Sequence, residues 1–102
     1  MEFPNFQWKN KTSLRNLSMM WRHQASCSST QEEKMKSIEE GLMRAKEAVE
    51  LDVEDGISWM ILGNAYLSSF FAISPDPDNL RKAMMAYLKA VRTHIIMHFE
   101  LI

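Results

Sequence analysis

Two pairs of side chains in this chain are spaced so that they could do chemistry from one face of a helix. His23 and Cys27 are four residues apart, and so are His94 and His98. A cysteine beside a histidine can act as a nucleophile, but it also needs an oriented base and an oxyanion site, and the serine-rich segment around Cys27 supplies neither. Two histidines at this spacing can bind zinc, but only the remote Glu100 accompanies them. We therefore interpret both pairs as solvated side chains and expect no catalytic residue, no metal and no cofactor.

The most informative spacing belongs to residues that pack. One group follows the pattern W-x2-L-G-x2-Y, and a second follows A-x3-Y-x2-A. These are the two halves of a tetratricopeptide repeat, a pair of helices that stacks on its neighbours. In such a pair, large residues fill the space between helices and small ones let the backbones approach. We expect the following residues to form one buried cluster between the third and fourth helices: Trp59, Leu62, Gly63, Tyr66, Ala83, Tyr87 and Ala90.

An earlier and weaker copy of the pattern precedes this one. Leu14, Leu17, Ser18 and Trp21 occupy the corresponding positions of a first helix. In the helix that follows, the small-residue positions hold Gly41, Ala45 and Ala48. The two halves of this first copy are separated by about ten more residues than in a standard repeat of ~34 residues. The second repeat carries about eight extra residues between its helices. The sequence therefore predicts two tandem helix pairs, each with an elongated loop between its helices.

These patterns predict an all-α fold of four helices, a fragment of an α-solenoid. We expect the helices at about residues 12–24, 32–51 and 57–71, with a fourth that begins near Leu80 and continues as far as about His98. The expected caps are Thr12 or Ser13 for the first helix, and Asp78 or Asn79 for the fourth. The expected organisation is an irregular lead-in (1–10), a degenerate repeat (11–55), a second repeat with an inserted loop at 72–78 (56–95) and an apolar tail (96–102). We expect the tail to fold back on the fourth helix or to drive self-association, because exposed apolar residues favour burial.

The first helix of each repeat should line a concave groove. Positions on its inward face hold Arg15, Met19 and Arg22 in the first repeat, and Met60 and Asn64 in the second. A guanidinium offers two parallel donors to a carboxylate, and an amide can both donate to and accept from an extended peptide. The sequence thus predicts a groove for a peptide that carries an acidic residue, the alternative being a solvated face with no ligand.

Composition limits the classes of partner. The chain has 102 residues and a formal net charge of -1, which argues against strong nonspecific nucleic-acid binding. Residues 31–60 nevertheless hold nine acidic and four basic side chains, whereas residues 1–30 hold four basic side chains and Glu2 alone. A single cysteine cannot form an internal disulfide and fits a reducing compartment. No secretory signal is visible, and no run approaches the ~18 apolar residues of a membrane span, so we expect no membrane partner.

Residues 10–90 resemble a known family more specifically than the repeat pattern requires. The segments N-K-T-S-L-R-N-L-S-M at 10–19, A-K-x-A-V-x-x-D-V-x-D-G at 45–56 and S-W-x-I-L-G-N at 58–64 are similar to central repeats of the tetratricopeptide repeat protein 5 (Strap) family, and the elongated loops match as well. Residues 1–9 and 93–102 do not share the likeness. The resemblance implies a cytoplasmic and nuclear scaffold with no enzymatic activity.

The resemblance also implies roles for the longer protein. Family members act as a stress-responsive transcription cofactor and as a ribosome-associated adaptor that recognises nascent tubulin. The expected partner is therefore a protein or a nascent peptide, with ribosomes or transcription cofactors engaged through the full-length protein. The alternatives are a structural segment that contributes only packing and, at the basic N-terminal face, nucleic-acid binding, which the charge makes the weakest of the three.

Overall fold

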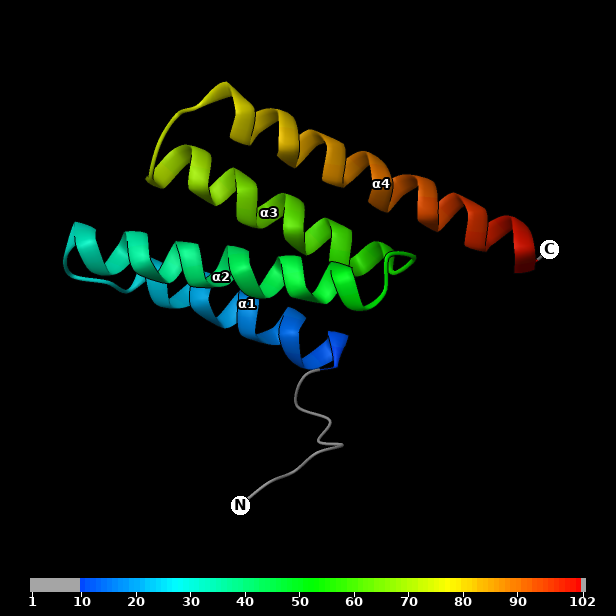
Figure 1. Cartoon of the computed structure of the whole chain (residues 1–102), viewed down its shortest axis with the longest axis horizontal. Coiled ribbons are helices and arrows are strands. Elements are labelled where there is room, and N and C mark those ends of the chain that lie inside the picture. Colours follow the sequence, from blue (N-terminus) through cyan, green and yellow to red (C-terminus); the bar gives the residue numbers. More distant parts are fainter. Residues whose placement is uncertain (1–9, 102) are drawn as a thin grey trace, which may run out of the picture.

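The computed structural model describes residues 10–101, and the side chains of residues 10–96. The described residues form four α-helices and no strand: α1 (Lys11–Ser26), α2 (Gln31–Leu51), α3 (Gly56–Ala72) and α4 (Pro77–Leu101) (Figure 1). The expected all-α fold of four helices is confirmed. The expected lead-in lies outside the described residues except for Asn10.

The first helix begins slightly earlier than predicted, because a different residue caps it. Asn10, rather than Thr12 or Ser13, caps α1, since its side chain accepts a hydrogen bond of 2.8 Å from the backbone N–H of Ser13. Asparagine is among the strongest N-caps, and it precedes both predicted candidates, so the helix starts at Lys11. Thr30 caps α2 in the same way, accepting from Glu33 at 3.1 Å.

The fourth helix also starts early. It begins at Pro77, and the Asp76 carboxylate accepts a hydrogen bond of 3.0 Å from the backbone N–H of Asp78. The prediction that Asp78 or Asn79 caps a helix beginning near Leu80 was therefore wrong. A proline is favoured at the first position of a helix because its missing N–H would have no intrahelical partner there. Residues 73–76 are thus the only non-helical residues in the region where an inserted loop was predicted at 72–78.

The helices form two antiparallel hairpins, joined where α2 packs against α3. Within the described part of the chain, α4 packs against α3 alone, and α1 touches α3 more lightly than it touches α2. The result is a slab with extents of 49 × 44 × 19 Å (Figure 1).

The core lies at the junction of the hairpins. Ala45 and Val49 of α2 meet Ile61, Leu62 and Ala65 of α3, and Ala86 of α4 closes the cluster. Leu42, Trp59 and Tyr66 pack against it while remaining partly exposed. The cluster differs from the predicted one, because it centres on α2 and α3 and its aromatic rings lie at the edge.

The other predicted repeat residues occupy the helix contacts. Ala83 is buried, at 1% exposure, whereas Trp21, Tyr87 and Ala90 are half-buried. A β-carbon placed on Gly63 would lie 2.6 Å from the Tyr87 ring, so only glycine allows α3 and α4 to approach there. The rings remain at the rim of the core because small residues occupy its centre.

The apolar tail does not fold back on α4. Residues 96–101 continue that helix to Leu101, and Ile95 and Ile96 are about half exposed. Side chains from residue 97 onward, His98 among them, lie outside the described residues.

We predict that Ala83→Leu destabilises the chain. Its added atoms have no space at the α3–α4 contact, and overpacking a buried site costs about 1–3 kcal/mol in unfolding free energy. Thermal and urea denaturation measure the loss. The matched control is Met84→Leu on the next residue, which is 59% exposed and should leave stability unchanged. Equal stability of the two variants would show that the α3–α4 packing is wrong.

Candidate peptide-binding groove

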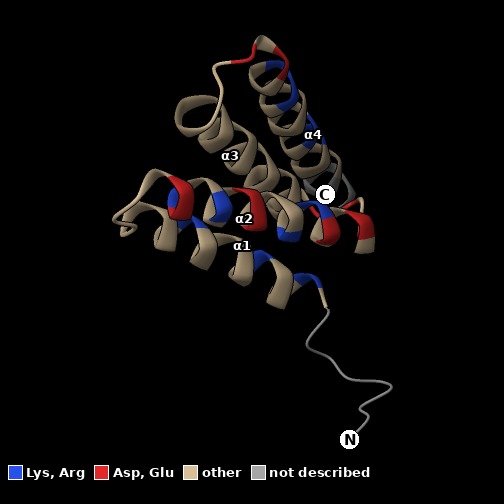
Figure 2. Cartoon of the chain, turned by 60° about the vertical axis from the view of Figure 1, so that its left-hand side comes forward, with Lys and Arg blue, Asp and Glu red and all other residues tan. Residues whose placement is uncertain are grey.

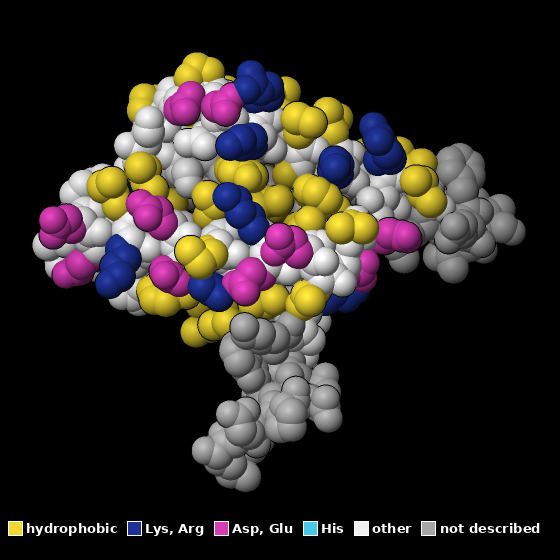
Figure 3. All heavy atoms as spheres, viewed as in Figure 1, with side chains coloured by type: hydrophobic (Ala, Val, Ile, Leu, Met, Phe, Trp, Pro, Cys, Tyr) yellow, Lys and Arg dark blue, Asp and Glu magenta, His cyan; other side chains and the backbone are white. Residues whose placement is uncertain are grey.

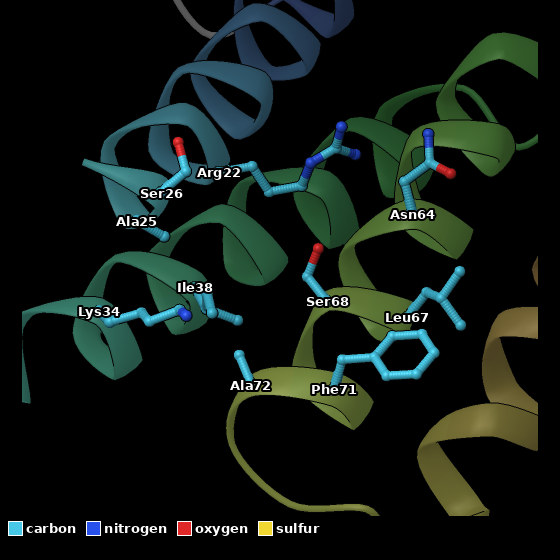
Figure 4. Close-up of a pocket in the computed structure, with 10 residues that line it drawn as sticks. All are labelled: Arg22, Ala25, Ser26, Lys34, Ile38, Asn64, Leu67, Ser68, Phe71 and Ala72. Atoms are coloured by element: carbon cyan, nitrogen blue, oxygen red, sulfur yellow. The ribbon is translucent and has the colours of Figure 1, made fainter. Parts of the chain in front are cut away.

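An open groove of about 460 Å³ lies between α1 and α3 (Figure 4). Residues from three helices form its walls: Arg22, Ala25 and Ser26 from α1, Lys34 and Ile38 from α2, and Asn64, Leu67, Ser68, Phe71 and Ala72 from α3. The start of α2 is tied to the end of α3 where the Gln31 side-chain amide donates to the Ala72 carbonyl at 3.1 Å. This hydrogen bond holds the start of α2 against the end of α3 at one end of the groove.

Arg22 is the residue in the groove whose hydrogen bonds are incomplete. Its Nη1 is enclosed by protein and has no hydrogen-bond partner among the residues that the structure describes. In Figure 4 the guanidinium extends from α1 across the space toward the side of α3 where Asn64 projects. An enclosed donor without a partner costs free energy, and an acceptor supplied by a ligand would remove that cost.

A hydrogen bond from α4 fixes the side chain of Asn64. The Tyr87 hydroxyl of α4 donates to the Asn64 side-chain oxygen. Burial raises the pKa of Tyr87, so its hydroxyl stays protonated and continues to donate at neutral pH. Because the oxygen is engaged with Tyr87, the Asn64 amide nitrogen is the group that can donate to a ligand in the groove.

The charge in the groove has one sign. Its lining includes two cations, Arg22 and Lys34, and no acidic side chain. At the end formed by α3 the lining is apolar, with Leu67 and Phe71, and the Phe71 side chain is 77% exposed. The arrangement therefore suits an acidic residue next to an apolar one.

Arg15 does not line this groove. Its Nη1 donates to the Asp55 carboxylate at 2.5 Å, and the two side chains are only 17% and 10% exposed. Ser58 donates to the same carboxylate at 2.5 Å, and Lys11 pairs with Asp52 at 2.6 Å. Arg15 therefore joins α1 to the start of α3, and a peptide could use it only by breaking that ion pair, so we leave it out of the proposed peptide site.

These contacts shift the acidity of both aspartates. Burial by itself would raise the pKa of Asp55, but the hydrogen bonds from Ser58 and Arg15 outweigh it and hold the pKa below its ordinary value. The hydrogen bond from Lys11, with a second from the backbone N–H of Glu54, lowers the pKa of Asp52. Both carboxylates are thus ionised at neutral pH.

The two predicted methionines also lie elsewhere. Met19 and Met60 are 42% and 46% exposed, and neither lines the groove. Met60 borders a separate hollow near the start of α3, with Ile57 and Val91. Of the five residues predicted for the groove, the structure brings together Arg22 and Asn64.

Several lining residues were not predicted. Ser26 and Ser68 lie one turn beyond Arg22 and Asn64, so extending the same helix face by four residues would have found them. Lys34 and Ile38 come from α2, which the repeat pattern assigns to the outer layer, and no spacing in the sequence indicates them.

The side chains first considered for chemistry form no larger cluster within the described part of the chain. The Cys27 sulfur lies 3.9 Å from His23 Nε2, and both residues are exposed on the surface. His94 is exposed, and His98 lies outside the described side chains. The described residues contain no group of three potential metal ligands, and none of their helices is long and apolar enough to cross a membrane.

Comparison with known proteins decides the family. The chain is 42% identical over 82 residues to tetratricopeptide repeat protein 5 of Homo sapiens, and 44% and 43% identical to the proteins of that name from Mus musculus and Bos taurus. The match covers 80% of this chain. No established protein-family profile matches the chain. The repeat region belongs to the tetratricopeptide repeat protein 5 family.

Membership in the tetratricopeptide repeat protein 5 family, together with the stacked hairpins, makes this region a scaffold for protein interaction. The matched residues span only 18% of the length of each of these relatives.

We predict that the Arg15–Asp55 ion pair makes stability depend on acid pH. Because the folded-state pKa of Asp55 is depressed, its contribution is complete above the ordinary value of 3.8 and is lost as the pH falls below it. Asp55→Asn keeps an equally good N-cap but removes the charge, and it should cost about 1–3 kcal/mol at pH 7. Thermal denaturation at several pH values measures the difference.

The control is Asp76→Asn at the N-terminus of α4, where the aspartate caps the helix without an ion pair to another described residue. It should leave the acid dependence of the parent unchanged. If Asp55→Asn destabilises the chain as much at pH 3 as at pH 7, the ion pair is not the source of the effect.

Proposed function

We propose that the groove between α1 and α3 binds an extended peptide that carries an acidic residue. One observation carries the proposal, which is a groove lined by two cations and, among the described residues, by no acid, with Arg22 Nη1 enclosed and without a hydrogen-bond partner in that part of the chain. Because Nη1 is enclosed, the Arg22 side chain must turn toward the groove before its guanidinium can pair with a carboxylate in a bidentate contact.

The rest of the groove supports the same ligand. Lys34 provides a second positive charge, and the Asn64 amide can donate to a backbone carbonyl of the peptide. The apolar end, with Leu67 and Phe71, can take an apolar side chain beside the acidic one. A short peptide therefore finds charge, backbone and apolar contacts in a single groove.

The family resemblance supports more specific roles for the longer protein. We propose that this region belongs to a stress-responsive transcription cofactor that also serves as a ribosome-associated adaptor for nascent tubulin in tubulin mRNA autoregulation. The proposed locations are the cytoplasm and the nucleus. A nascent chain is extended and presents its N-terminal residues first, which is the form of ligand that an open groove accepts.

The alternative is a structural segment that contributes packing alone. The Arg15–Asp55 pair favours it for the first half of α1, because Arg15, which was expected to bind a ligand, serves to join the repeats. The incomplete hydrogen bonding of Arg22 favours binding for the second half.

We predict that Arg22→Ala weakens binding of a synthetic peptide with the acidic N-terminal sequence of tubulin by about ten- to a hundredfold. Arg22→Lys should restore the charge without the planar fork and rescue binding only in part. Isothermal titration or fluorescence anisotropy on the full chain measures the affinity, after circular dichroism has confirmed that each variant is helical.

The matched control is Arg44→Ala, which removes a guanidinium that pairs with Glu40 and Glu47 on α2, outside the groove. A peptide with glutamine in place of its glutamate should bind the parent chain as weakly as the acidic peptide binds Arg22→Ala. Equal affinity of the parent and Arg22→Ala for the acidic peptide would refute the groove and leave the structural segment as the function.

A further inference from the structure

A second, independent feature lies on the opposite side of α3. Two aromatic rings there are covered by lysine ammonium groups: Lys89 Nζ lies 4.6 Å from the centre of the Trp59 ring, and Lys46 and Lys82 Nζ lie 5.6 and 5.8 Å from the centre of the Tyr66 ring. At 100° per residue, Trp59 and Tyr66 lie on the side of α3 opposite to Asn64 and Phe71. The three lysines therefore mark a face that is separate from the peptide groove.

This face carries an excess of positive charge along α4. The described side chains of α4 include four bases, Arg81, Lys82, Lys89 and Arg92, and one acid, Asp78, which pairs with Arg81 and lies 3.9 Å from Lys82. Neither Lys46 nor Lys89 takes part in an ion pair within the described part of the chain. Figure 3 shows dark-blue side chains spaced along α4, with hydrophobic side chains exposed between them and α2.

Two of the lysines, Lys82 and Lys89, line a hollow with an apolar floor. It measures about 200 Å³ and is lined by Leu62 and Ala86 as well as by the aromatic rings, with the 55% exposed Met85 at its edge. That volume is enough for one apolar side chain. A ligand that pairs with the lysines can therefore also bury a hydrophobic residue between them.

We infer that this face, which we call the lysine face (Lys46, Lys82, Lys89, Trp59 and Tyr66), docks an acidic segment of a partner protein that presents one apolar side chain to the hollow. Charge complementarity carries the inference, because Lys46 and Lys89 have no ion-pair partner among the described residues, and Lys89 borders the apolar pocket together with Lys82, whose contact with Asp78 is long. The contact would be independent of the peptide in the groove between α1 and α3.

The geometry favours a protein over a single-stranded nucleic acid. Bases bind single-stranded sites by stacking on open aromatic rings, whereas here lysine ammonium groups cover the rings. The neighbouring α2 also bears acidic side chains such as Glu47 and Glu50, as Figure 2 shows for the helix as a whole, and these repel a long phosphate chain. A short acidic segment can follow α4 and meet α2 at Lys46 alone.

The test uses the full chain and a fluorescent synthetic peptide in which glutamates and aspartates flank a central Leu-Phe pair. Lys82→Glu combined with Lys89→Glu should weaken binding at least about tenfold, because it places like charges opposite the peptide. Lys36→Glu, the same reversal on an exposed lysine of α2 away from this face, should change affinity less than roughly twofold. In a two-dimensional NMR titration, the indole N–H signal of Trp59 should shift on binding.

Two further measurements distinguish binding at the lysine face from binding in the groove between α1 and α3. Arg22→Ala should leave the Trp59 indole shift unchanged, whereas the double lysine variant should keep binding to the tubulin N-terminal peptide. Loss of both by either variant would show that the two surfaces are one site.

Three results would overturn the inference: no binding of the acidic peptide at the Trp59 indole, equal affinity of the parent and the double variant, or tighter binding of an oligouridine with a steep salt dependence, which would assign the face to nucleic acid. Sedimentation that shows the chain pairing with itself through this face, and losing that pairing in the double variant, would also overturn it in favour of self-association.

Discussion

The close approach of the helices at residues with little or no side chain is the constraint on which the rest of this structure depends. A β-carbon on Gly41 would lie 3.2 Å from the Ser18 carbonyl oxygen, and Ser18 itself is fully buried and donates to the Gly41 carbonyl at 2.7 Å. Gly63 makes the corresponding approach between α3 and α4. Larger residues at these positions would push apart the two helices within each hairpin, and would so displace α1, which carries Arg22, and α3, which carries Asn64.

Two arginines seven residues apart on α1 have different roles in this packing: one joins helices, and the other lines the groove. Arg15 finds Asp55, which also caps α3, so the residue that starts the third helix holds the first helix against it. Arg22, two turns further on, faces the uncharged surface of α3, which contains no charged residue at all. The same side chain in the same orientation therefore stabilises one end of the α1–α3 contact and remains available at the other.

The sequence was sufficient for the helices and for part of the groove. Periodicity and the repeat spacing gave four helices in the right order, because local patterns of large and small residues determine them. Of the predicted groove residues, Arg22 and Asn64 line the hollow between α1 and α3, because both lie on the inward face of a first helix. The sequence did not indicate the Arg15–Asp55 ion pair, because the two residues are forty positions apart, or the place of Lys34 in the groove, because Lys34 belongs to the second helix of its pair; neither contact leaves a local pattern. The caps Asn10 and Asp76 were misplaced by a few residues for a different reason, since adjacent polar residues compete to start a helix.

The slab is only 19 Å thick along its shortest dimension. An extended chain advances about 3.3 Å per residue, so some ten residues reach farther than that thickness. A single flexible partner with an acidic motif at each end of such a linker can therefore occupy both sides of α3 at once. Its second contact then forms at an effective concentration in the millimolar range, so two weak contacts can combine into one firm attachment.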